Sequence, residues 1–188
     1  MLLKEHKVLK TAIVELPEKE KDKLLLRLIA KDKVLTEHLH FKLLEDESDL
    51  EQRSVQMKAE MDEAGAVFAQ DPKLSPKDVL TTFRKLNGRI NHHFKVTKDI
   101  SSEVELRIYL LNCIPVLCKE SVFSSLYKFQ EKLITYFVRT TLSAVNKYTK
   151  LHEDLQFDLK DGLNNVLNKI YTGKMAAAAQ ELKLPKEF

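Results

Sequence analysis

Residues 75–98 have the sequence SPKDVLTTFRKLNGRINHHFKVTK, and this stretch decides the fold class. Ser75 can cap a helix, Pro76 fits the first helical position, and Asp78 places negative charge in the first turn. At about 100° per residue, the apolar side chains fall on one face: Val79, Leu80, Phe83, Leu86, Ile90 and Phe94. The stretch therefore predicts an amphipathic helix over about 76–98.

The rest of the chain repeats this helical pattern. Glycine occurs four times and proline five times in 188 residues, so the turn chemistry that β-hairpins need is scarce. Further helices are expected at about 2–15, 17–31, 33–45, 47–69, 102–119, 121–148 and 151–171. We expect an all-α fold, a multi-helix array of stacked αα-hairpins with about seven or eight helices, either a closed bundle or a short superhelix.

The expected organisation is a single helical domain over 1–173. Residues 174–188 are a C-terminal tail, either a short Ala-rich helix or a frayed end. The segment 121–148 is the most apolar and is expected to be the central helix. Ser102 and Glu105 have capping-box spacing at the start of the expected helix at 102–119. Pro115 lies within that helix and should kink it. One apolar stripe is expected to be buried in the helix at 17–31: Leu24, Leu25, Leu28 and Ile29.

Composition narrows the class of protein only slightly. Hydrophobic residues make up 44% and charged residues 31%, which is typical of a folded chain, and the net charge is +3. No apolar run approaches the length that spans a bilayer. Cys113 and Cys118 do not form a disulfide framework, and we expect both to be buried and inert. These features favour a cytoplasmic protein.

Two stretches carry a resemblance to other proteins. The first is LPE at 16–18 followed by LLLRL at 24–28, and the second is LHEDLQFD at 151–158. Together they resemble a group of uncharacterised all-helical bacterial proteins. The resemblance implies a helical fold and no particular chemistry, because that group has no assigned activity.

A basic face is the sharpest charge feature. The helix at 76–98 carries six basic residues and one acidic residue, Asp78. The basic residues are Lys77, Arg84, Lys85, Arg89, Lys95 and Lys98. Such a face can bind phosphates by counterion release. Its polar side carries no aromatic residues for base stacking, which argues against single-strand recognition. Alternatively, the acid-rich segment 45–63 pairs with this helix and neutralises it.

A polar site is the weakest candidate. Glu37 and His40 form one Glu-x-x-His motif, whereas di-iron bundles need two such motifs and two further glutamates. His152 opens an acidic first turn, where acid is ordinary compensation of the helix dipole, and we expect it to form a buried hydrogen bond between helices. A site built from Glu37, His40 and His152 stays open, but the sequence predicts no metal and no cofactor.

No complete catalytic set emerges from the acidic, basic and nucleophilic residues. We therefore expect a non-enzymatic helical scaffold or adaptor that binds another macromolecule, a protein partner or a second copy, through helix surfaces. The polar segment 47–69 is the first candidate for a dimer contact. A nucleic-acid-associated protein that uses the basic face is the alternative, and a metal- or ligand-binding helical enzyme is the third possibility.

Overall fold

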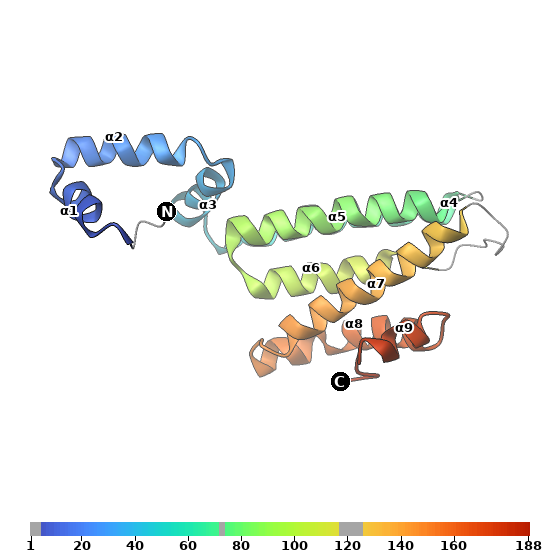
Figure 1. The fold of residues 1–188 in the computed structure, drawn as a ribbon. Coiled ribbons are helices and arrows are strands. Elements are labelled where there is room, and N and C mark those ends of the chain that lie inside the picture. Colours follow the sequence, from blue (N-terminus) through green and yellow to red (C-terminus); the bar gives the residue numbers. More distant parts are fainter. Residues whose placement is uncertain (1–4, 72–73, 117–125) are drawn as a thin grey trace. The chain divides into compact units, whose positions relative to one another are not determined.

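The computed structural model describes residues 5–71, 74–116 and 126–188. Over these residues it contains nine helices and no strand, which confirms the all-α fold (Figure 1). None of these helices is long and apolar enough to cross a bilayer. The chain divides into two compact units, Met1–Glu45 and Asp46–Phe188, and each is described by itself.

The described residues of the N-terminal unit, Met1–Glu45, form three short helices. They are α1 (Lys7–Glu15), α2 (Glu18–Ile29) and α3 (Lys33–Leu44). The Asp32 carboxylate caps α3 by accepting from the Leu35 backbone N–H at 3.0 Å. Helices α2 and α3 pack together as the expected hairpin.

The buried stripe predicted for α2 is wrong. No residue of α2 is buried, and Leu25 and Leu28 are 56% and 53% exposed. Two short helices cover only the strip where they touch, so apolar side chains on the other sides of α2 remain in water.

The C-terminal unit, Asp46–Phe188, contains six helices among its described residues. They are α4 (Glu47–Gln70), α5 (Pro76–Thr97), α6 (Ile100–Cys113), α7 (Tyr127–Tyr148), α8 (Glu153–Tyr171) and α9 (Ala176–Glu181). Helix α6 packs against α4, α5, α7 and α8, and Figure 1 shows it beside α5 and next to the oblique α7. This unit is therefore a bundle around α6.

The central helix is α6 rather than the segment 121–148. Eight of the 14 residues of α6 are buried, and they cover about 240° around the helix axis. Helix α7 buries nine of its 22 residues on one face and leaves Lys128, Lys132 and Arg139 exposed on the other. The apolar content of 121–148 is high, but α7 packs mainly against α5 and α6, whereas α6 packs extensively against α4, α5, α7 and α8.

Both ends of α6 also differ from the prediction. The Asp99 carboxylate, not the Ser102 hydroxyl, is the N-cap, and it accepts from the Ser102 backbone N–H at 2.6 Å. The helix ends at Cys113 and is not kinked, because Ile114 is extended before Pro115, as the residue before a proline prefers. Residues 117–125, which include Cys118 and parts of two predicted helices, lie outside the described residues.

The C-terminal residues form the helix that was one of two alternatives for 174–188. Met175 and Ala179 are buried against the core of the unit. The Phe188 ring lies 5.0 Å from the Tyr148 ring, edge to face, and its backbone N–H donates to the Asn164 side chain at 2.9 Å. These contacts hold the end of the chain against α7 and α8.

Candidate functional site

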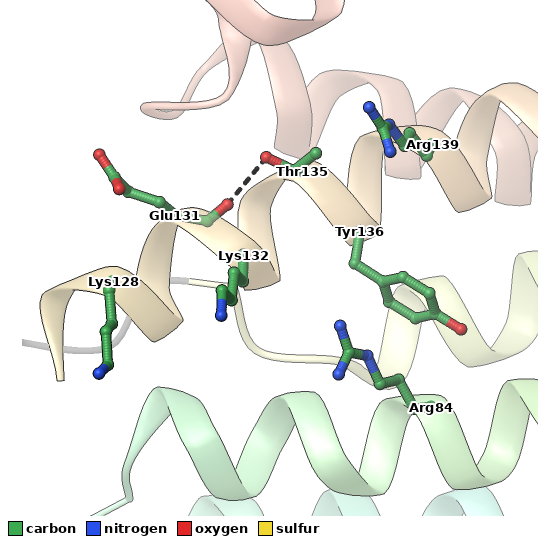
Figure 2. Close-up of a pocket in the computed structure, with 7 residues that line it drawn as sticks. All are labelled: Arg84, Lys128, Glu131, Lys132, Thr135, Tyr136 and Arg139. Atoms are coloured by element: carbon green, nitrogen blue, oxygen red, sulfur yellow. Dashed lines mark hydrogen bonds between the residues drawn. The ribbon is translucent and has the colours of Figure 1, made fainter.

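A groove of about 410 Å³ lies between α5 and α7 (Figure 2). Its lining contains four cationic side chains and one carboxylate: Arg84, Lys128, Glu131, Lys132, Thr135, Tyr136 and Arg139. The groove therefore carries an excess of three positive charges. We refer to these seven residues as the α5–α7 groove.

The cations of α7 share one side of their helix. Lys128, Lys132 and Arg139 are spaced by four and seven residues, which places them within about 40° of one another around the axis. Figure 2 shows Lys128 and Lys132 pointing toward α5, from which Arg84 rises. The carboxylate of Glu131 points away from α5 in the same view. On the side that faces α5, the lining thus carries Lys128, Lys132 and Arg84 beside the Tyr136 ring and no carboxylate, whereas Arg139 points away from α5.

Two aromatic rings lie against three of the four groove cations, Arg84, Lys128 and Lys132, and against the nearby Lys77. The Nζ atoms of Lys77, Lys128 and Lys132 lie 5.9, 5.5 and 5.6 Å from the centre of the Phe129 ring. The guanidinium carbon of Arg84 lies 5.4 Å from the centre of the Tyr136 ring. Cation–π attraction steadies the positive groups without neutralising them.

The cations of the groove have no ion pair with any carboxylate of the described chain. Arg89, one turn further along α5 than Arg84, does form one, with Glu60 of α4. Positive charges that gather in excess of their counter-charges raise the local potential, and an anion lowers it. The groove is therefore suited to a ligand with several negative charges.

Beneath the groove, a buried polar network holds Tyr136. The Tyr136 hydroxyl accepts from Asn87 Nδ2 at 2.8 Å, and Asn87 Oδ1 accepts from Arg107 Nη1 at 2.9 Å. The Tyr136 ring packs edge-on against Phe83, with centroids 4.9 Å apart. Because these partners come from α5 and α6, the network fixes the position of α7 relative to α5.

The charge in this network is balanced by Glu103. Its side chain is 1% exposed and accepts from Arg107 Nη2 and Lys147 Nζ, each at 2.5 Å. The Lys147 ammonium also lies 4.4 Å from the centre of the Phe94 ring. Glu103 therefore joins α6 to α7 at the base of the site.

The structure divides the basic residues that the sequence singled out. Arg84 lines the groove, whereas Arg89 turns toward α4 and pairs with Glu60. Lys85, Lys95 and Lys98 are exposed but do not line the groove. The acid-rich segment 45–63 thus neutralises Arg89. The role of the five basic residues from the sequence in anion binding stays a prediction.

The three residues of the polar-site candidate lie in ordinary structural contacts. His40 Nδ1 is 2.9 Å from Glu45 Oε1, and Glu37 lies 3.8 Å from Lys33. His152 is exposed and caps α8 through its Nδ1, which corrects the expected buried hydrogen bond, since the first position of a helix at the surface faces water. In the part of the chain that the structure describes, no three His, Cys, Asp or Glu side chains gather as metal ligands.

Two further titratable groups have structural contacts in the interior: His93 is buried and Lys169 is half-buried. His93 Nε2 lies 3.0 Å from the Ser102 hydroxyl, and burial lowers the pKa of His93, an effect that Arg53 reinforces and Asp99 partly offsets. Lys169 donates to the carbonyls of Leu111 and Ile114 at the end of α6. Burial also lowers the pKa of Lys169. Both groups hold α6 in place and lie outside the groove lining.

The α7 half of the groove is the part that sequence reasoning missed. A helical projection of 127–148 would have found the basic side formed by Lys128, Lys132 and Arg139. No projection of one helix, however, says that this side lies next to Arg84. No family model matches the chain, and no curated protein or solved structure shows a match. The resemblance to bacterial helical proteins therefore stays a prediction.

Proposed function

We propose that this protein is a helical binding module that holds nucleic acid through the phosphate groups of its backbone, using the α5–α7 groove. The observation that supports it best is the set of four groove cations, contributed by two helices, with no carboxylate partner in the described chain. The proposal joins two expectations from the sequence, a scaffold that binds another macromolecule and a nucleic-acid-associated protein, because one surface would serve both.

The length of the groove favours a polymer over a single phosphate. Lys128 and Arg139 are eleven residues apart on α7, which corresponds to about 16 Å along the helix. Successive phosphates of one duplex strand advance about 3.4 Å along the helix axis. The groove therefore has room for several phosphates, and its cations are spread over that length.

The state of the aromatic rings favours backbone contacts over base stacking. Phe129 is surrounded by three ammonium groups, and Tyr136 is engaged by Arg84 on one side and Phe83 on another. Rings that are already covered do not offer a free face to a base. We therefore expect binding with little dependence on base sequence, since phosphate contacts carry no sequence information.

The test is fluorescence anisotropy with a labelled duplex and a labelled single strand at about 50 and about 200 mM salt. With about four phosphates neutralised, affinity for the duplex should fall about 100-fold between the two conditions. The double variant Lys132→Glu with Arg139→Glu should lose binding. The control, Lys85→Glu with Lys160→Glu, has the same net charge but leaves the groove intact and should retain most of the affinity.

Two results would overturn the proposal. One is the absence of binding to either oligonucleotide at the lower salt by protein whose helical content is intact in circular dichroism. The other is equal loss of affinity in both double variants, which would mean that net charge, rather than the groove, holds the ligand. Displacement of the duplex by polyglutamate at equal charge concentration would assign the groove to acidic proteins instead.

A further inference from the structure

The cations along the α5–α7 groove are not evenly spaced. Lys77, in the first turn of α5, lies near the Phe129 ring of α7. About two turns further along both helices, Arg84 lies near the Tyr136 ring. Three ammonium groups gather at the first ring, whereas one guanidinium lies at the second. Positive charge is therefore densest at the end of the groove where α5 and α7 begin.

The Phe129 ring marks the centre of this charge. It is partly buried and packs against the core of the C-terminal unit, so its position is fixed. The Nζ atoms of Lys77, Lys128 and Lys132 lie 5.9, 5.5 and 5.6 Å from the ring centre. We refer to these three lysines and Phe129 as the lysine cluster. Ammonium groups that lie this close to one point can donate together to the oxygens of one phosphate group.

No carboxylate of the described chain neutralises the lysine cluster. Its three ammonium groups have neither an ion pair nor a hydrogen-bond acceptor among the described residues. Two carboxylates are adjacent to these lysines in the sequence. Asp78 accepts from the Ser75 hydroxyl at 2.7 Å, and Glu131 points away from α5 in Figure 2. Because like charges repel, an anion with two charges stabilises the cluster more than an anion with one.

The end of a nucleic acid strand carries such an anion when it is phosphorylated. Each internal phosphate of the strand is a diester with one negative charge. A terminal phosphate is a monoester, with a charge of about −1.5 to −2 at pH 7 and three strong acceptor oxygens. Arg84 and Arg139 lie further along the groove as separate charges, which suits a row of diesters. The lysine cluster, in contrast, suits the monoester.

We propose that the lysine cluster binds the terminal phosphomonoester of a nucleic acid strand, whose backbone then continues along the groove past Arg84. This inference rests on the proposed nucleic-acid binding and deepens it, because the protein then prefers phosphorylated strand ends to strand interiors. A 5′-phosphate and a 3′-phosphate offer the same chemistry to the three lysines. The test therefore includes both.

The test is fluorescence anisotropy with one short duplex in three forms, each labelled at the opposite end. One form has a 5′-phosphate, one has a 3′-phosphate, and one has hydroxyl groups only. The ligand control is a hydroxyl-ended duplex that is one base pair longer, because its two additional diesters give it about the same net charge as the phosphorylated forms. The wild type should bind at least one phosphorylated form about 10-fold more tightly than this control, since the monoester accepts additional charge-assisted hydrogen bonds.

Two variants of α5 form a matched pair, because Lys77 and Lys85 are both exposed and each change removes one positive charge. Lys77→Gln should reduce the preference for the phosphorylated end to about twofold or less. Lys85→Gln, at a residue outside the groove lining, should keep the full preference. Lys128→Gln provides a second route to the same loss. Arg139→Gln should weaken the binding of phosphorylated and hydroxyl-ended duplexes by the same factor, because Arg139 lies outside the lysine cluster.

The outcomes separate this inference from the proposed function. Equal affinity of the wild type for all four duplexes, with measurable binding to each, would overturn the inference and leave nucleic-acid binding by the groove intact. A preference for the phosphorylated end that both Lys77→Gln and Lys128→Gln retain would also overturn the inference. Absence of binding to every duplex would overturn the proposed function, and the inference with it.

Discussion

Removal of the Glu103 charge should strongly destabilise the C-terminal unit. Glu103 is 1% exposed and Arg107 4% exposed, and the carboxylate is the ion partner of both Arg107 and Lys147. In Glu103→Gln, two cationic groups at the base of the groove lose their counter-charge while Arg107 stays buried. Breaking a buried pair in this way costs about 3–5 kcal/mol.

This cost is a large fraction of the total, because a domain of this size is stable by about 5–15 kcal/mol. Urea denaturation followed by circular dichroism measures it. With a slope of about 2 kcal/mol per molar urea, the midpoint should fall by about 2 M.

A matched control lies two residues further along the same helix. Glu105 accepts from Lys58 Nζ at 2.6 Å, and both side chains are partly exposed to water. Glu105→Gln therefore loses a surface ion pair, which contributes about 0–1 kcal/mol. Equal midpoints for Glu103→Gln and Glu105→Gln would refute the reasoning, because burial would then make no difference to the pair.

Three further predictions concern single side chains. Burial holds His93 neutral and lowers its pKa, so the unfolded chain takes up a proton before the folded chain does as pH falls below about 6.5. The stability of the wild type in urea should therefore decrease between pH 7 and pH 5 by more than that of His93→Gln. Parallel decreases in the two proteins would contradict this. Lys169→Met should destabilise by about 1–3 kcal/mol, since buried carbonyls at the end of α6 lose their donor, whereas the exposed Lys160→Met should change little. Gly88→Ala should raise stability by about 0.5–1 kcal/mol, because a Cβ at this helical position meets nothing within 4 Å. Gly162→Ala should gain less, because its Cβ would lie 3.1 Å from Ile108. Equal gains in melting temperature for the two variants would argue against close packing around Gly162.

Local signals predicted the helix starts well. The Ser75 hydroxyl accepts from the Asp78 backbone N–H at 3.2 Å, as the sequence indicated, because a cap depends on only four consecutive residues. Where two caps compete, local signals were not enough. Asp99 and Ser102 are three residues apart, and the left-handed conformation of Lys98, with φ of 59°, starts the new helix at the earlier one.

Tertiary arrangement accounts for what the sequence did not predict. A projection of one helix places Arg84 and Arg89 about 140° apart, on opposite flanks of the apolar face. It does not say that Arg84 faces α7 and that Arg89 faces α4, where Glu60 pairs with it. The centre of the bundle depends in the same way on which helices surround which. A single sequence specifies the faces of each helix, whereas the neighbour of each face follows from the packing of all of them together.

The most direct test of the proposed function is the salt dependence of duplex binding, compared between single charge-neutralising variants. The logarithm of the wild-type association constant should fall with the logarithm of salt concentration with a slope of about −3.6, for about four phosphates neutralised. Lys132→Gln should reduce the magnitude of that slope by about 0.9, and Lys160→Gln should leave it unchanged. The same slope in all three proteins would contradict a role for the α5–α7 groove in binding nucleic acid.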